Sequence, residues 1–235
     1  ISLTIPKRFS RPNIESLAKG FQKSAKEFRL KILGGDTNEG KELVINFSLF
    51  GVTEKIVKRK GAKTNHVIIT SGPFGHTGAG FAILLKNKKC SKKFGAKAKS
   101  AVFKPRCRLM FGLKNKKHFS SSMDSSDGLS TTLNEMSNQS KKKFVITSMP
   151  SENDVLEFAK SNELNSNNLI LNSGEEYEIV ATTSKSNLTK VKNNARKHRI
   201  KLYEIGYVTK GRGVFYKKNG KFVRIKDGGW KHLKH

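Results

Sequence analysis

The chain has 235 residues, enough for one large or two modest domains with a hydrophobic core. It carries 47 Lys plus Arg against 18 Asp plus Glu, a formal net charge of +29, and 35% of its residues are hydrophobic. Periodic runs of Phe, Leu, Ile and Val exclude a disordered tail, and no apolar stretch is long enough to cross a membrane. We therefore expect a globular protein without a membrane partner.

The basic residues are densest between Lys86 and Lys117, where thirteen Lys and Arg occur without an acidic residue. Lysine dominates this stretch, and regular aromatic interleaving of a base-stacking surface is absent from it. A solvated basic face is therefore favoured over a nucleic-acid groove, although phosphate attraction needs only charge. Two cysteines, Cys90 and Cys107, form no metal-ligand pattern, and we expect buried or free thiols in a reducing cytoplasm.

The first part of the chain predicts a helix, a turn and a strand. Apolar residues fall at helical spacing over 13–28, and a glycine-rich turn follows at 34–38. Hydrophobic alternation then predicts a strand over 43–50. The polar stretch 52–65 is the predicted domain boundary.

A strand over 66–70 opens the second part and leads through a glycine-rich loop, 71–80, into a helix over 81–86. Strand, glycine loop and helix in this order can hold a phosphate. The loop lacks the GxxxxGK[ST] pattern, so close packing of the helix on the strand is favoured.

Strands and helices then mix, and Asn219-Gly220 predicts a tight hairpin. This mixture predicts an α/β or α+β fold with a mixed sheet. The predicted strands cover 120–123, 144–147, 176–182, 202–208, 213–216 and 221–225, and the predicted helices cover 129–138, 152–160 and 188–198.

Several of the few carboxylates lie in glycine-flanked turns after strand-like segments, namely Asp36, Asp124 and Asp127, and an acidic cluster follows at 175–178. Such carboxylates suit Mg²⁺, which prefers hard oxygen ligands. Each turn alone is explained as well by ordinary turn or cap chemistry, with Ser126 or Asp127 capping the next helix. The recurrence of the pattern favours a site for a magnesium nucleotide.

Seven segments of the chain resemble, in order, those of the thiamine-monophosphate kinases. They are Gly34-Gly35-Asp36-Thr37, Arg59-Lys60-Gly61-Ala62, Asp124-Ser125-Ser126-Asp127-Gly128-Leu129, Ser173-Gly174-Glu175-Glu176-Tyr177-Glu178, Ile205-Gly206, residues 211–214, and Gly229-Trp230-Lys231-His232. Ser173 stands where that family has Gly, and Glu176 where it has Asp. The resemblance runs from near Leu3 to the last residue.

This resemblance implies a two-domain fold like that of aminoimidazole ribonucleotide synthetase, with N-terminal domains that pair in a homodimer. Residues 1–53 resemble only the tail of that ATP-binding and dimerisation domain, and 64–235 the C-terminal α/β domain. The N-terminal domain is thus expected to be incomplete. Family members carry further Mg²⁺-binding aspartates ahead of the matched region, so we expect this chain alone to be inactive.

The implied reaction is the transfer of a phosphoryl group from ATP to thiamine phosphate, giving thiamine diphosphate. The implied Mg²⁺ ligands are Asp36, Asp124 and Asp127. Gly35, Asp36, Arg59 and Ser126 would contact ATP, and Glu175 and Trp230 the thiamine part. For Trp230, an ordinary core position is the alternative.

Two other functions stay open at this point. One is a sister ATP-dependent enzyme with another acceptor, which Glu175 and Trp230 disfavour. The other is a catalytically dead, basic nucleic-acid-binding protein on the same scaffold, which the net charge of +29 supports.

Overall fold

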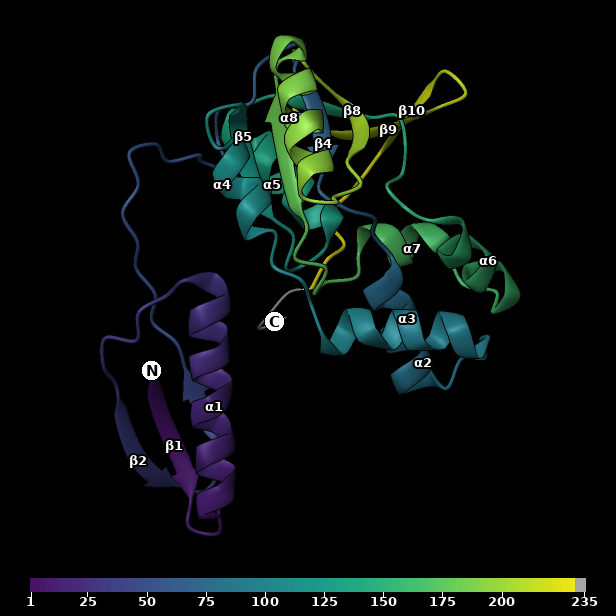
Figure 1. Ribbon diagram of the computed structural model, residues 1–235. Coiled ribbons are helices and arrows are strands. Elements are labelled where there is room, and N and C mark those ends of the chain that lie inside the picture. The colour runs from purple at the N-terminus through teal and green to yellow at the C-terminus, as the bar shows by residue number, and fades with distance from the viewer. Residues whose placement is uncertain (231–235) are drawn as a thin grey trace. The chain divides into compact units, whose positions relative to one another are not determined.

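The computed structural model describes residues 1–230 and divides the chain into two compact units, Ile1–Glu54 and Lys55–His235. The last two residues of the terminal motif, Lys231 and His232, lie outside the described residues. Each unit has its own sheet (Figure 1).

The first unit has one long helix and a three-stranded sheet of order β2-β1-β3. In it β1 pairs with β2 in parallel and with β3 antiparallel. The rings of Phe21 and Phe47 meet edge to face, 5.7 Å apart. No residue of this unit is buried, and apolar side chains line an open cleft of about 1040 Å³. Its elements are β1 (Ser2–Pro6), α1 (Arg11–Phe28), β2 (Asp36–Gly40) and β3 (Val44–Asn46).

Three details of this unit differ from the sequence prediction. Residues 36–40 form a strand instead of a turn, because β1, which the sequence analysis missed, offers them a parallel partner. The strand expected over 43–50 ends at Asn46, since its ladder with β1 spans only three residue pairs. Hydrophobic alternation alone does not show where a partner strand stops.

The second unit contains a seven-stranded mixed sheet of order β10-β9-β6-β8-β4-β7-β5. Only β6 and β9 run parallel, and every other neighbouring pair is antiparallel. A mixed sheet was predicted, and it is confirmed. The strands are β4 (Val67–Thr70), β5 (Phe119–Asp124), β6 (Lys143–Ile146), β7 (Ile179–Thr183), β8 (Tyr203–Thr209), β9 (Gly213–Lys218) and β10 (Lys221–Arg224).

Helices cover both faces of this sheet and form a separate helical layer beyond one end (Figure 1). One face packs on α5 and the other on α4 and α8, while α2, α3, α6 and α7 pack mainly on one another. Among the described residues, none of the helices is both long and apolar enough to cross a membrane. The helices are α2 (His76–Lys86), α3 (Lys92–Phe103), α4 (Leu109–Asn115), α5 (Leu129–Ser140), α6 (Asn153–Ser161), α7 (Ser166–Leu171) and α8 (Lys185–Lys197).

Helix α2 begins at His76, five residues before the predicted start, directly after Gly75 in a left-handed conformation (φ +104°). A side chain on Gly80 would collide with the backbone of Ala98, so glycine lets α2 and α3 approach closely. The loop therefore serves close packing, as predicted, but the partner at Gly80 is a helix and not a strand.

The hairpin predicted at Asn219-Gly220 is confirmed. Both residues are left-handed (φ +48° and +76°), which is the conformation that a type I′ turn requires. Strand β7, expected from residue 176, begins only at Ile179, because the preceding residues form a loop. Both cysteines are free and exposed.

Candidate active site

Two loops of the second unit, one after β5 and one before β7, are joined by backbone hydrogen bonds. Asp124 lies opposite Ile179 at the end of the β5–β7 ladder. Beyond it, the Tyr177 N–H donates to the Ser125 carbonyl at 2.9 Å, and the Glu175 N–H donates to the Ser126 carbonyl at 2.7 Å. The pairing of β5 with β7 therefore brings the two motifs side by side, although about fifty residues separate them in sequence.

The C-terminal segment, residues 227–230, contacts the loop after β5 and the start of α5. The Trp230 N–H donates to the Asp127 carbonyl at 3.1 Å, and the Thr131 hydroxyl donates to the Asp227 carboxylate at 2.6 Å. A side chain on Gly229 would collide with the Asp127 carbonyl, so glycine permits this contact. The Trp230 side chain is 67% exposed, which contradicts the alternative of an ordinary core position.

The negative charges of Asp124 and Asp127 are not balanced by nearby basic side chains. Within residues 1–230, no Lys, Arg or His side chain lies within ion-pair distance of Asp124 or Asp127. The Tyr177 hydroxyl donates to Glu175 Oε2 at 2.7 Å. This hydrogen bond raises the pKa of Tyr177 to about 12, with help from burial and from the charges of Glu175, Asp124 and Asp127. The second unit thus holds a local negative field in a chain whose net charge is +29.

The loop that carries Glu175 and Tyr177 is conformationally strained. Both residues have left-handed backbones, with φ of +67° and +51°. Such conformations are uncommon outside glycine and persist where surrounding contacts fix them. Here the contacts are the two hydrogen bonds to the loop after β5 and a buried network behind the loop.

That network centres on Glu178, a buried carboxylate next to β7. Arg108 binds both of its oxygens, with Nε to Oε2 at 2.8 Å and Nη2 to Oε1 at 2.5 Å, and Ser71 Oγ donates to Oε2 at 2.5 Å. The hydrogen bond to Glu178 raises the pKa of the Arg108 guanidinium. Gly72 packs against the same carboxylate, where a Cβ would collide with it. The buried charge is thereby paired and its oxygens are satisfied.

The side chain of Glu176, which lies between Glu175 and Tyr177 in the sequence, contacts the start of α2. Its Oε1 accepts hydrogen bonds from the N–H groups of Gly75 at 2.6 Å and Thr77 at 3.3 Å. Loss of hydration nevertheless raises the pKa of Glu176 to about 7, against the effect of these hydrogen bonds. A carboxylate of the chain itself therefore occupies the N–H groups that a bound phosphate would use.

The capping role considered for Ser126 and Asp127 is not observed. The N-cap of α5 is Gly128, and no side chain caps that helix. Ser126 instead accepts through its carbonyl from Glu175, and Gly174 packs against that carbonyl with no room for a Cβ. Neighbouring Ser125 is buried, and its Oγ lacks a partner among the described residues.

Arg59 lies in the same unit, on the segment beside β5. The carbonyl of its neighbour Lys58 accepts from the Ser122 N–H of β5 at 3.0 Å. The guanidinium is 3.9 Å from Glu135 of α5, an exposed and weak ion pair that leaves it available to other anions.

Gly35 and Asp36 belong to the first unit, at the start of β2. The Asp36 carboxylate accepts from the Thr37 N–H at 2.9 Å and from Asn38 Nδ2 at 2.8 Å. Gly35 packs against the backbone of Ile1 with no room for a side chain. Gly35 and Asp36 are thus residues of the first unit. The site residues that the structure brings together within the second unit are Asp124, Ser126, Asp127, Glu175 and Trp230.

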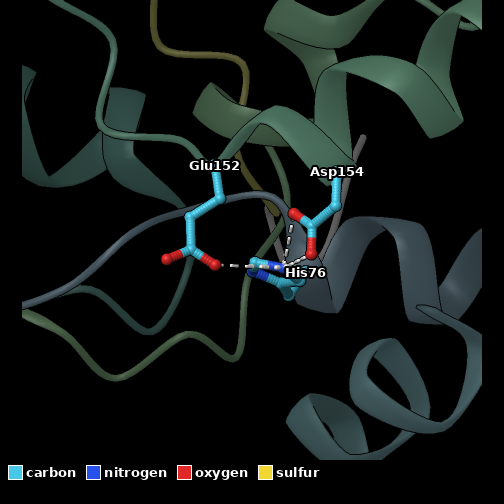
Figure 2. A group of neighbouring side chains, drawn as sticks. All are labelled: His76, Glu152 and Asp154. Atoms are coloured by element: carbon cyan, nitrogen blue, oxygen red, sulfur yellow. Dashed lines mark hydrogen bonds and ion pairs between the residues drawn. The ribbon is translucent and has the colours of Figure 1, made fainter. Parts of the chain in front are cut away.

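A second group of possible metal ligands lies elsewhere in the second unit. His76, Glu152 and Asp154 point toward one another, with His76 Nε2 3.2 Å from Asp154 and 3.9 Å from Glu152 (Figure 2). Lys97 already binds both carboxylates, with Nζ 2.6 Å from each. Burial and the Lys97 charge lower the pKa of His76. We interpret this cluster as an ion-pair network that joins α2, α3 and α6.

Comparison with known proteins supports the assignment made from the motifs. Residues 63–218 match the family model described as AIR synthase related protein, C-terminal domain. A thiamine-monophosphate kinase of Nitrosopumilus maritimus is 52% identical over 234 residues, which cover 100% of this chain and 74% of that protein. The chain belongs to the thiamine-monophosphate kinase family.

Two further proteins are also similar to this chain. The thiamine-monophosphate kinase of Pyrococcus horikoshii is 32% identical, with 99% of this chain and 71% of that protein covered. A solved structure described as AaThiL complexed with AMPPCP and TMP matches with a TM-score of 0.78 at 27% identity, covering 99% of this chain and 72% of that one. The expected family and fold are thereby confirmed.

Sequence reasoning missed the groups that hold this kinase loop in place. Tyr177 and Glu178 lie inside a motif that the sequence analysis quoted, but neither received a role. Arg108 lies seventy residues before its partner Glu178 and stands in the basic stretch that was interpreted as a solvated face. Because the partner is distant in sequence, only the structure separates Arg108 and Lys97 from the lysines around them.

Proposed function

We propose that this chain supplies most of an enzyme that transfers the terminal phosphoryl group of ATP to thiamine phosphate, forming thiamine diphosphate. The 52% identical relative is named for this activity, and the solved relative is described with AMPPCP and TMP bound. The observation that supports it best is the meeting of the Asp124–Asp127 turn, Glu175 and Trp230 in one place.

Asp124 and Asp127 are proposed to bind Mg²⁺. Their donor chemistry fits, because exposed or half-buried carboxylates without a basic partner suit a hard divalent cation. When bound, Mg²⁺ neutralises charge on the phosphates that react. Asp36 is proposed as a further Mg²⁺ ligand.

The remaining side chains would bind and orient the two substrates. Arg59 is proposed to contact a phosphate of ATP, which its weak pair with Glu135 permits. Gly35 and Ser126 are also proposed to contact ATP. Gly35 would let ATP approach the backbone closely, and Ser126 would contact it through its polar groups. The acceptor phosphate is already ionised at neutral pH, so the chain needs no strong general base for this reaction.

The thiamine part is proposed to lie against Glu175 and Trp230. Thiamine carries a positive charge, which a carboxylate and an aromatic face both attract. The hydrogen bond from Tyr177 fixes the Glu175 carboxylate in one orientation. An enzyme of the same superfamily with another acceptor is the alternative, but no observation of this chain favours it.

We also propose a homodimer through the first unit and a location in the cytoplasm. The homodimer is supported by the apolar cleft of that unit, in which no residue is buried. The location is supported by two exposed, free thiols, which persist in a reducing compartment. Size measurements on the purified protein test the homodimer, and a monomeric size would contradict it. Phe50→Glu in the cleft should shift the protein to a monomer; a variant that stays dimeric would contradict the cleft as the interface.

The function is tested by an assay of thiamine diphosphate formation with magnesium ATP. The chain spans 74% of the N. maritimus kinase, so it is assayed alone and fused to the part of that relative that it does not match. We expect turnover from the fusion and none from the chain alone. A folded fusion that forms no thiamine diphosphate would contradict the proposed reaction, whereas turnover by residues 1–235 alone would contradict only the expected dependence on further residues.

A further inference from the structure

One face of the large sheet is not covered by helices toward its β10 end. In the strand registers, Tyr207 lies opposite Val145, and Val145 opposite Phe215, so their side chains point to the same face. Phe222 lies opposite Lys217, two residues after Phe215 on β9, and shares that face. Helix α8 covers this face only near β4 and β7, through Val191 and Ala195.

Aromatic rings on this open face are accessible to solvent. Tyr207 is 37% exposed and Phe222 is 48% exposed. Lys143 Nζ lies 4.5 Å from the ring centre of Phe215 and 4.6 Å from that of Phe222. Phe215 is half-buried, and Val145 between Tyr207 and Phe215 is buried. The exposed rings of this face are therefore those of Tyr207 and Phe222.

The same region is strongly positive. Residues 209–226 contain seven Lys and Arg and no Asp or Glu. Lys143 on β6 lies opposite Gly213 of β9, and Lys141 and Lys142 directly precede it between α5 and β6. None of these cations lies within ion-pair distance of a carboxylate in the part of the chain that the structure describes. The nearest strand with an acid is β8, where Glu204 pairs with Lys192 at 2.5 Å. These cations are therefore not paired with carboxylates, in contrast to Lys97 and Arg108. Lys143 lies over the rings of Phe215 and Phe222, and Lys217 Nζ lies 5.9 Å from the ring centre of Phe222.

We propose that this face, which we call the hairpin face (Tyr207, Lys143, Phe215, Lys217, Phe222 and Arg224), binds single-stranded nucleic acid. Phosphates would pair with the lysines and arginines, and bases would stack on the exposed rings. Four-stranded sheets with exposed aromatic residues bind RNA in this way and stack about two or three bases. The binding is independent of the kinase reaction, because none of these residues belongs to the proposed active site.

The shape of the hairpin disfavours other anionic partners. Its tip, residues 218–221, contains Lys, Asn, Gly and Lys and no apolar side chain that could enter a bilayer. The tip extends from the sheet in Figure 1, whereas Phe215 lies on β9 and Phe222 on β10. An acidic peptide would match the charge but would leave the ring faces without a stacking partner.

The test measures binding of an unstructured, labelled single-stranded RNA of about twelve nucleotides by fluorescence anisotropy over a range of salt concentrations. The triple variant Lys217→Ala, Lys218→Ala, Lys221→Ala should reduce the slope of log K against log salt by about 2. Phe222→Leu should weaken binding about tenfold with an unchanged slope, and Phe222→Trp should strengthen it.

The matched control is Lys86→Ala, Lys88→Ala, Lys89→Ala, which removes the same charge from the lysine-rich stretch without an aromatic surface. It should leave affinity and slope nearly unchanged. Equal losses in the two triple variants would show that net charge alone acts and would overturn the proposal. So would equal competition by inorganic polyphosphate of the same charge, or binding to anionic lipid vesicles that depends on Phe222.

Discussion

Arg108 and Glu178 form a two-point ion pair, with Nε to Oε2 at 2.8 Å and Nη2 to Oε1 at 2.5 Å, directly behind the loop that holds Glu175 and Tyr177. Glu178 is buried, and its second partner is Ser71. The pair is therefore the support of a strained loop, and its removal should affect both stability and substrate binding.

Arg108→Ala should lower the free energy of unfolding of the second unit by about 3–5 kcal/mol, because it leaves a buried carboxylate without a counter-charge. Arg106→Ala, two residues away and exposed, should change it by less than about 0.5 kcal/mol. Denaturant unfolding of both variants measures the difference. Similar values for the two would show that the Arg108 pair contributes no more than a surface charge.

Glu176→Gln should remove a pH dependence of stability. The pKa of Glu176 is raised to about 7 in the folded chain, so proton uptake favours folding. This stabilisation is complete below about pH 4.5 and is lost as the pH rises through about 7, by roughly 3 kcal/mol in total. The variant should thus be more stable than the parent chain at pH 8, because the amide oxygen still accepts from Gly75.

Thermal unfolding at pH 5 and pH 8 measures this effect as a difference between the two chains, which cancels other titrating groups. Glu157→Gln on the exposed side of α6 is the control and should show no pH-dependent difference. A parent chain that gains stability relative to Glu176→Gln above pH 7 would contradict the raised pKa.

Asp124→Asn and Asp127→Asn, each in the fusion with the relative's remaining residues, should lower kcat about a hundredfold or more, since each removes a charge that holds Mg²⁺. Stability should not fall, because neither carboxylate has an ion-pair partner in the described residues. A readout independent of activity is the phenol of Tyr177, whose pKa of about 12 should fall when Asp127 loses its charge. Turnover near that of the parent at saturating Mg²⁺ would rule out the ligand role.

Trp230→Ala should raise KM for thiamine phosphate about 3–30-fold and change KM for ATP little, in line with an aromatic contact to a cation. Trp230→Phe should recover most of the loss. Steady-state kinetics with each substrate varied in turn distinguish this from a structural role, which would change both KM values together.

Residue patterns along the chain are enough to predict the family, the mixed sheet and most elements of the second unit. Local patterns suffice for these: strands were predicted at 144–147 and 202–208, where β6 and β8 lie, helical spacing predicted α1, and Asn219-Gly220 predicted the last hairpin. The sequence also predicts Asp124, Asp127 and Glu175 as site residues, because they stand in motifs that resemble those of the family.

The contacts of these residues, in contrast, depend on how remote segments of the chain fold together. The β5–β7 ladder joins Ser125 and Ser126 to the Glu175 loop, and Asp127 is not the N-cap of α5, because that helix begins after Gly128. Likewise, Lys97 and Arg108 form ion pairs with carboxylates far away in sequence, while the lysines of the β9–β10 hairpin form none among the described residues. Ion pairing and burial depend on distances between segments remote in the chain, and no local pattern of residue types contains those distances.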